Sequence, residues 1–349
     1  PYLKVLYLYL QTNNQKISLK RILIIQTASL GDVILCTPII EKLHEVYPNA
    51  KIDFLLKKGY ETLLLNHPKL HHIIVWDKKE NRYRKLSKLI STLRQKEYDL
   101  IINAQRYFSS GLITVLSNAQ QTVGFSKNPL SIFFTHRKKH KIGTSEGNPH
   151  ETERNLSLIE DFTDASNFPM KLYPTQQDFA KVSQYKTQQF ITISPASLWF
   201  TKQFPKEKWV ELIRNLEKHM VIYLLGSSKE VNLCNEIILE SGHVNYLNLA
   251  GKLTFLESTA LMKDAKMNFV NDSAPMHMAS SIDAPVTAIY CSTIPEFGFG
   301  PKSSKSYIIQ SSKALRCRPC GIHGHNKCPK KTFECAYTIP INQLTNLVT

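Results

Sequence analysis

The alternation of strand-like and helix-like segments constrains this chain more than any other feature of its sequence. Short apolar runs at residues 21–25 (RILII), 51–58 and 72–77 have the pattern of buried strands. Between such runs lie helical patterns, as at residues 83–98, where leucine and isoleucine recur three and four positions apart. This order predicts a parallel sheet with helices on both faces.

The same alternation restarts in the second half of the chain, with strand patterns at residues 190–196, 220–228 and 267–272. Residues 143–183 interrupt it with a polar loop, one helix and a proline-containing stretch. At 349 residues the chain is also too long for one ordinary core. We therefore expect an α/β protein of two Rossmann-like, doubly wound domains facing across a cleft.

The predicted domain boundary lies near residues 165–185. We assign residues 1–175 to the N-terminal domain and residues 176–349 to the C-terminal domain, which ends in a cysteine-rich tail at 317–335. Residues 1–10 are too short to span a bilayer and precede no small-residue cleavage site. We interpret them as a leader strand or the edge of the chain, not as a signal peptide.

The charge balance favours an anionic partner. Lysine and arginine number 44 against 28 acidic residues, which gives a net charge of +16. Such a field attracts nucleic acid, an anionic membrane surface or a phosphorylated substrate. Basic residues are densest at 78–88 and 136–141, where an ordinary solvated face is an equally good explanation. Neither stretch has a nucleic-acid-binding signature, so we expect no nucleic-acid partner.

Loops after four of the predicted strands carry the candidate functional residues. They span residues 27–32, 194–205, 224–230 and 271–277. Ligands of doubly wound sheets bind at the carboxyl ends of strands, so all four loops converge on one cleft. None contains GxGxxG or a Walker lysine–serine pair, so nicotinamide and P-loop sites have no support.

The loop at 271–277 (NDSAPMH) predicts an anion site. Asp272 or Ser273 can cap a helix whose first turn holds Pro275. Free backbone N–H groups at such a helix end suit a diphosphate. An ordinary capped helix is the simpler interpretation of this loop taken alone.

Two further loops each carry one charged residue of interest. Lys202, preceded by Thr201, can neutralise phosphate as a point charge, or it can be a surface lysine. Glu230 can hold ribose hydroxyls, or it can simply favour the dipole of its helix.

Asp32 is the acid of the first loop. Ser29 and Gly31 would satisfy a turn here without an acid, so the acid requires its own explanation. Asp32 is either a helix N-cap or a base at the mouth of the cleft.

The seven cysteines fall into two groups. Cys36, Cys234 and Cys291 lie in apolar segments, as buried free thiols do, which favours a reducing compartment. The others form C-x2-C-x7-C-x6-C around His323 and His325; they are Cys317, Cys320, Cys328 and Cys335. Structural zinc is compatible with this set, although the spacing is not that of two standard knuckles. A zinc-ribbon nucleic-acid module is the competing interpretation, and no paired base supports a catalytic thiol.

Several ordered stretches resemble the ADP-heptose:lipopolysaccharide heptosyltransferases, glycosyltransferase family nine. The resemblance runs from about Lys20 to the end of the chain. It rests on four stretches: SLGDVILCTPII, GNPHETERNL, SPASLWFTKQFPKEKW and the long block at residues 250–295. In this family the fold is GT-B, and the enzymes are metal-independent inverting transferases that move heptose from an ADP donor onto the lipopolysaccharide inner core.

The resemblance implies roles for individual residues. Asp32 would be the general base, with Ser29 and Gly31 in its loop. The donor would be bound by Thr201 and Lys202 at the diphosphate, Glu230 at the ribose, and a group around the heptose: Asp272, Ser273 and His277. Ala274 stands where relatives usually have glycine, which narrows the backbone approach to the diphosphate.

The implied chemistry needs no cofactor for catalysis. A carboxylate can deprotonate the acceptor, while lysine and a helix N-terminus stabilise the departing ADP. The implied partners are ADP-heptose and a lipid A/Kdo-type acceptor, with cytoplasmic localisation and peripheral contact with the inner membrane through the basic stretches. The alternatives are a GT-B transferase of another nucleotide sugar and a non-catalytic protein that binds anionic surfaces.

Overall fold

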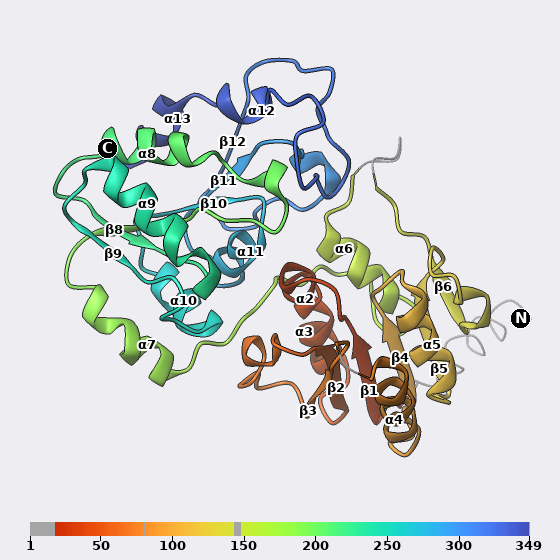
Figure 1. Ribbon diagram of the computed structural model, residues 1–349. Helices are drawn as coiled ribbons and strands as arrows, with labels where there is room; N and C mark the ends of the chain where they lie inside the picture. The colour runs from red at the N-terminus through yellow and green to blue at the C-terminus, as the bar shows by residue number, and fades with distance from the viewer. Residues whose placement is uncertain (1–17, 80, 143–147, 349) are drawn as a thin grey trace, which may run out of the picture.

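The computed structural model describes residues 18–79, 81–142 and 148–348. The predicted leader at residues 1–10 lies outside the described residues, as do residues 143–147 of the polar loop. The chain forms two sheets, each covered by helices (Figure 1). The predicted α/β architecture of two doubly wound halves is confirmed.

The first half contains a six-stranded sheet in the order β3-β2-β1-β4-β5-β6, with every pairing parallel. Its strands are β1 (Arg21–Ile25), β2 (Lys51–Lys57), β3 (His72–Trp76), β4 (Leu100–Asn103), β5 (Gln121–Phe125) and β6 (His136–Lys138). Its helices are α2 (Leu30–Leu35), α3 (Thr37–Val46), α4 (Arg82–Arg94), α5 (Phe108–Leu116) and α6 (Glu151–Leu156).

The second half repeats the arrangement with the order β12-β11-β10-β7-β8-β9, again all parallel. Its strands are β7 (Phe190–Ser194), β8 (Val221–Leu224), β9 (Tyr246–Asn248), β10 (Met267–Asn271), β11 (Val286–Tyr290) and β12 (Ser306–Gln310). Its helices are α7 (Gln176–Val182), α8 (Lys206–Arg214), α9 (Val231–Ser241), α10 (Phe255–Met262), α11 (Ala274–Ser281), α12 (Glu334–Tyr337) and α13 (Ile341–Thr345).

Strand β1 shows why its sequence is apolar throughout. Successive side chains of a strand point to opposite faces of the sheet. Ile22 and Ile24 pack in one cluster with α2 and α3, whereas Leu23 and Ile25 pack in another with α4. Burial on both faces requires a continuous apolar run, as is usual in parallel sheets.

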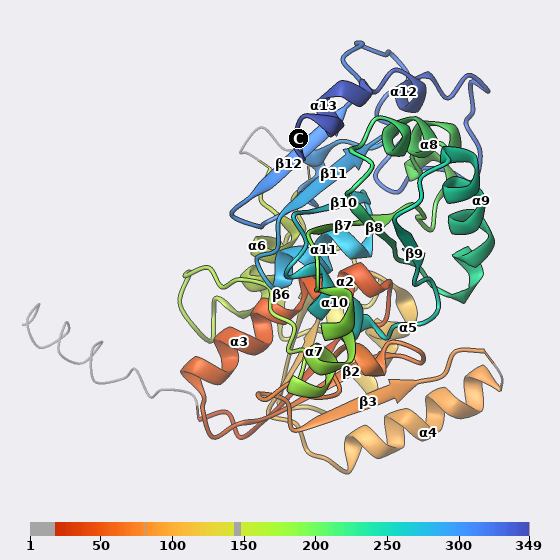
Figure 2. The ribbon, with the colours of Figure 1, turned by 90° about the vertical axis from the view of Figure 1, so that its left-hand side faces the viewer.

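The first apolar cluster continues from one half of the molecule into the other. It includes Val33 and Ile34 of α2 together with Met276 and Ala279 of α11. In both views α2 and α11 meet where the halves face each other (Figures 1 and 2). The facing ends of the two halves are therefore held by a shared apolar core.

The chain changes its packing partners between residues 173 and 176. The Tyr173 hydroxyl donates to the Glu41 carboxylate of α3, and the Lys171 N–H donates to Thr37. Helix α7, which follows, packs against α10 of the second half. The domain boundary at residue 175 stays a prediction.

Some elements were not predicted from the sequence. Strand β6 is short and basic (HRK), and it forms the edge of the sheet within the basic stretch at residues 136–141. Strand β12 is half exposed, so it lacks a buried-strand pattern. Within the described ranges, every helix is too short or too polar to span a bilayer.

Candidate active site

The loop after β1 leads into helix α2, whose first turn carries Asp32. Ser29 is the N-cap, and its backbone N–H and hydroxyl donate to Asp32 Oδ2 at 2.9 and 2.6 Å. The Asp32 N–H donates back to Ser29 Oγ at 3.3 Å, which completes a capping box. The interpretation of Asp32 as the N-cap is therefore wrong, because the acid stands three residues inside the helix.

This capping box leaves half of the carboxylate available. Both side-chain bonds of Asp32 go to Oδ2, and no group in the described part of the chain donates to Oδ1. The side chain is partly exposed. A carboxylate with a fixed rotamer and one uncommitted oxygen can accept a proton from a bound hydroxyl group.

Gly31 allows the two halves to approach closely at this point. A Cβ on Gly31 would lie 3.2 Å from His277 Cδ2 and 3.8 Å from the Ala274 Cα, both on α11. The N-terminal turn of α2 therefore lies directly against the N-terminal turn of α11. This contact brings the first and the fourth of the predicted loops together.

Lys202 and Asp272 form an ion pair at the ends of two neighbouring strands. The Lys202 Nζ lies 2.7 Å from Asp272 Oδ2, and the side chains are only 15% and 7% exposed. Asp272 directly follows β10, and Lys202 ends a short 3-10 turn (Phe200–Lys202) after β7. The structure thus joins the second and fourth predicted loops.

Two residues that the sequence analysis missed hold this pair in place. The Thr293 hydroxyl donates to Asp272 Oδ2 at 2.6 Å. The Asn271 amide donates to the Pro195 carbonyl and accepts from the Phe204 N–H, so it fixes the loop that carries Lys202. Asn271 is the last residue of β10, and Thr293 lies three residues after the end of β11, so a position at a strand end was the available sequence signal.

Among the described residues, no side chain caps the N-terminus of helix α11. Ser273 occupies the N-cap position, but its side chain makes no capping bond and donates instead to the Asn271 carbonyl. Pro275 lies in the first turn, as predicted. The free N–H groups at this end give the site a second positive element beside Lys202.

Two buried histidines lie at the junction of the halves. Burial, together with the charges of His150 and Lys202, lowers the pKa of His277 to about 3. Burial also lowers the pKa of His150 to about 4. His277 Nδ1 is buried and has no hydrogen-bond partner in the described part of the chain. Both imidazoles are therefore neutral at pH 7.

Thr201 and Glu230 are already engaged by the protein. The Thr201 hydroxyl accepts from the His325 N–H at 2.7 Å and from the Ser292 hydroxyl at 3.0 Å. Glu230 closes a capping box with Ser227, whose N–H and hydroxyl donate to Oε2 at 2.6 and 2.5 Å. Their donor-binding roles stay predictions.

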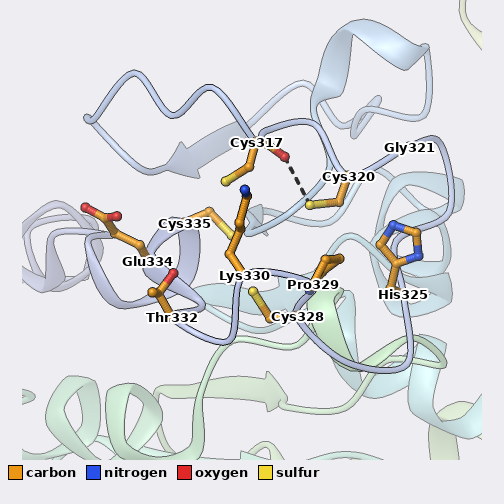
Figure 3. Close-up of a pocket in the computed structure, with 10 residues that line it drawn as sticks. All are labelled: Cys317, Cys320, Gly321, His325, Cys328, Pro329, Lys330, Thr332, Glu334 and Cys335. Carbon is orange, nitrogen blue, oxygen red and sulfur yellow. Dashed lines mark hydrogen bonds between the residues drawn. The ribbon is translucent and has the colours of Figure 1, made fainter.

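The four tail cysteines line one cavity of about 240 Å³ (Figure 3). All are free thiols, and the Cys320 thiol donates to the Cys317 carbonyl. No three of the four sulfur atoms lie within 4.8 Å of one another, so this arrangement is not a closed tetrahedral site. Cys36, Cys234 and Cys291 are buried and free, as predicted.

The two basic stretches are only partly solvated. Lys78 donates to the Thr27 carbonyl and hydroxyl, Lys85 pairs with Asp77, and His140 is buried against Glu151. The exposed basic side chains in these stretches include Lys79, Arg84, Lys88, Arg137 and Lys139.

Comparisons with known proteins identify related sequences. Residues 86–329 match glycosyltransferase family 9 (heptosyltransferase). Lipopolysaccharide heptosyltransferase 3 of Escherichia coli is 28% identical over 281 residues, which cover 75% of this chain and 81% of that protein.

Solved structures share the fold. The structure of E. coli ADP-heptose LPS heptosyltransferase II has a TM-score of 0.75 at 21% identity, covering 94% of this chain and 97% of that one. The structure of E. coli heptosyltransferase WaaC with ADP has a TM-score of 0.68 at 21% identity, with coverages of 82% and 92%.

Proposed function

The chain belongs to glycosyltransferase family 9 and is a glycosyltransferase; on that premise we propose that it transfers heptose from ADP-L-glycero-D-manno-heptose onto the inner core of lipopolysaccharide. We propose further that the transfer inverts the anomeric centre and requires no metal. Relatives named as lipopolysaccharide heptosyltransferases, and a similar fold solved with ADP, support the choice of donor and acceptor.

One observation carries this proposal: the two halves present opposite chemical groups to the same region. Helix α2, which carries Asp32, packs against α11, which follows Asp272. The charges of Asp32, Lys202 and Asp272 all act on one side chain, His323. We infer that the three groups act on one sugar-diphosphate.

The proposed mechanism uses Asp32 as the base. The acceptor hydroxyl oxygen forms a bond to the anomeric carbon while its proton passes to Asp32 Oδ1. On the opposite side, the bond from the anomeric carbon to the diphosphate oxygen breaks, and ADP leaves with the electron pair. Attack from the face opposite the leaving group inverts the centre.

The second half stabilises the leaving group in this proposal. Lys202 and the free N–H groups of α11 supply positive charge where negative charge develops on the diphosphate. Asp272 and Ser273, with His277 beside them, would contact the heptose, and Glu230 the ribose. This set of protein groups is the reason why we expect transfer without a metal.

Purified protein tests the proposal with ADP-heptose and a Kdo-containing lipid A acceptor. We expect heptosylated product with inverted anomeric configuration by NMR, and equal rates with and without EDTA. A panel of ADP-, GDP- and UDP-sugars tests the alternative that Ala274 raises, a different nucleotide sugar. Transfer from another donor but not from ADP-heptose would contradict the donor assignment.

We also propose that the enzyme works at the cytoplasmic face of the inner membrane. The acceptor is a lipid, and the exposed side chains of Lys79, Arg84 and Lys88 supply a positive surface on the first half. Replacing all three with alanine should weaken sedimentation with anionic vesicles, whereas Lys218→Ala in the second half should not. Wild-type binding that ignores salt concentration would contradict this attraction.

We propose that the four tail cysteines hold a structural metal ion. Four thiols in one cavity suit zinc or iron, and a bound ion would hold the tail, with no part in the transfer. We expect about one ion per chain by elemental analysis, and loss of the ion with a lower Tm in Cys320→Ser. The control Cys234→Ala removes a buried thiol elsewhere. Wild-type protein without a bound metal, together with a Cys320→Ser variant that keeps the wild-type Tm, would contradict this proposal.

A further inference from the structure

The loop between Cys320 and Cys328 is fixed to the donor side of the active site. The His325 N–H donates to Thr201 Oγ1 at 2.7 Å, and the Thr201 N–H donates to the His325 carbonyl at 3.1 Å. At the start of the loop, the Cys320 N–H donates to the Ser292 carbonyl at 2.8 Å. Both ends of residues 320–325 are therefore bonded to residues that neighbour Lys202 or Thr293.

Gly324 brings this loop into direct contact with Lys202. Its backbone is left-handed, with φ of +75°, and a Cβ there would lie 2.8 Å from Thr201 Oγ1 and 3.1 Å from Lys202 Cγ. A side chain at this position would be strained and would press against Thr201 and the stem of Lys202. The residue before Gly324 consequently emerges beside Lys202.

That residue is His323, whose exposed side chain interacts electrostatically with charged groups from both halves. Asp32 and Arg106 act on it from the first half, and Lys202 and Asp272 act on it from the second. Asp32 is the proposed base, and Asp272 is the proposed contact of the transferred sugar. His323 therefore borders the space in which the sugar would lie.

We propose that His323 hydrogen-bonds a hydroxyl of the transferred sugar, so that the cysteine-rich tail forms a third wall of the active site. This inference rests on the proposed function. It assigns a sugar contact to a segment that belongs to none of the four strand-end loops. It also explains why the tail is bonded to Thr201 and Ser292 instead of forming a separate nucleic-acid module.

The chemistry of His323 suits a hydroxyl better than a phosphate. Partial desolvation of the exposed ring, with the nearby Lys202, lowers its pKa, so the imidazole is neutral at pH 7. A neutral imidazole both donates and accepts, as a sugar hydroxyl does. The diphosphate already has Lys202 and the α11 N-terminus, which are stronger partners for an anion.

His323→Ala tests the assignment by separating the sugar from the nucleotide. Loss of one neutral hydrogen bond should lower kcat/KM for the nucleotide sugar by about 3- to 10-fold. The Kd of ADP, measured by calorimetry, should stay within about twofold of wild type. His323→Gln, which keeps one donor and one acceptor, should recover part of the lost activity.

Asn326→Ala is the matched control, because Asn326 is exposed on the same loop and has no hydrogen-bond partner among the described residues. It should behave as wild type, and all variants should share the wild-type Tm. Unchanged kcat/KM in His323→Ala would overturn the inference. An equal loss of ADP affinity would also overturn it, because the imidazole would then contact the diphosphate.

Failure of the proposed function gives a different result. A wild-type chain that neither binds ADP-heptose nor transfers from it would refute the heptosyl transfer itself, and the sugar contact with it. A wild-type chain that transfers heptose, beside an unaffected His323→Ala variant, refutes only the role of His323.

Discussion

Each half of the molecule carries an aspartate near the contact between α2 and α11, but the two carboxylates are held in opposite ways. Asp32 of the first half is partly exposed and bonded only within its own helix cap. Asp272 of the second half is buried, paired with Lys202 and bonded by Thr293. The first carboxylate keeps a free oxygen, whereas the second is neutralised.

This difference separates a base from a binding residue. A base must reach its substrate proton without first breaking an ion pair, and Asp32 meets that condition. In the proposed function Lys202 would contact the diphosphate while lying 2.7 Å from Asp272, so donor binding would compete with the existing ion pair. Removing one member of such a buried pair leaves the other uncompensated.

Replacing Asp32 should have the largest effect, and this effect should be on turnover. We expect Asp32→Asn to lower kcat by about 100- to 10,000-fold, because the amide cannot take the proton. Its oxygen can still accept from Ser29, so the helix cap is kept. Binding of ADP should remain near wild type by calorimetry. Near-normal turnover would exclude Asp32 from proton transfer.

Replacing Lys202 should have the next largest effect, but on binding. Lys202→Met removes a charged partner of the diphosphate and should weaken ADP binding by about 10- to 100-fold. The double variant Lys202→Met/Asp272→Asn separates the lost phosphate contact from the unpaired Asp272. If the double variant restored ADP affinity, the effect of Lys202 would be only to neutralise Asp272.

Replacing Thr293 should have a smaller effect, because it removes only one hydrogen bond to Asp272. Thr293→Val keeps the shape of the side chain but removes the hydrogen bond to Asp272. We expect kcat/KM to fall by about 10-fold, since bonds to charged groups contribute more than neutral ones. The Kd of ADP should change little, because Lys202 remains. A selective loss of ADP affinity would instead place Asp272 at the diphosphate.

The smallest predicted effect is on the pH dependence of folding stability, through His277 where the two halves meet. His277 is neutral in the folded chain, with a pKa of about 3, whereas an unfolded histidine binds a proton below about pH 6.5. The unfolded state therefore binds more protons between these values, and stability falls as the pH drops below about 6.5. The slope contributed by each such histidine is at most about 1.4 kcal/mol per pH unit.

His277→Gln, which cannot titrate, should lessen this loss but not abolish it, because His150 has a pKa of about 4 and acts in the same direction. Urea unfolding at pH 7 and pH 5 measures the difference. The pH range lies above the ordinary pKa of carboxyl groups, so acidic residues contribute little. Equal pH dependence in variant and wild type would contradict the buried neutral His277.

Periodicity alone was enough to predict the α/β architecture and strands such as β1, β2, β7 and β10. A continuous apolar run such as β1 has no other stable place than the middle of a covered sheet. Local chemistry likewise predicted Pro275 in the first turn of α11 and the placement of Thr201 and Lys202 after β7. Short or half-exposed strands such as β6 and β12 had no such signal.

The tertiary structure decided which residues meet. No spacing in the sequence relates Asp32 to α11, Thr293 to Asp272 or His325 to Thr201, because those contacts depend on how separate strand ends converge. Sequence patterns report forces between neighbours along the chain, such as caps and alternating burial. Contacts between the halves arise only when the two folded halves share a core, and that shared core brings α2 and α11 together.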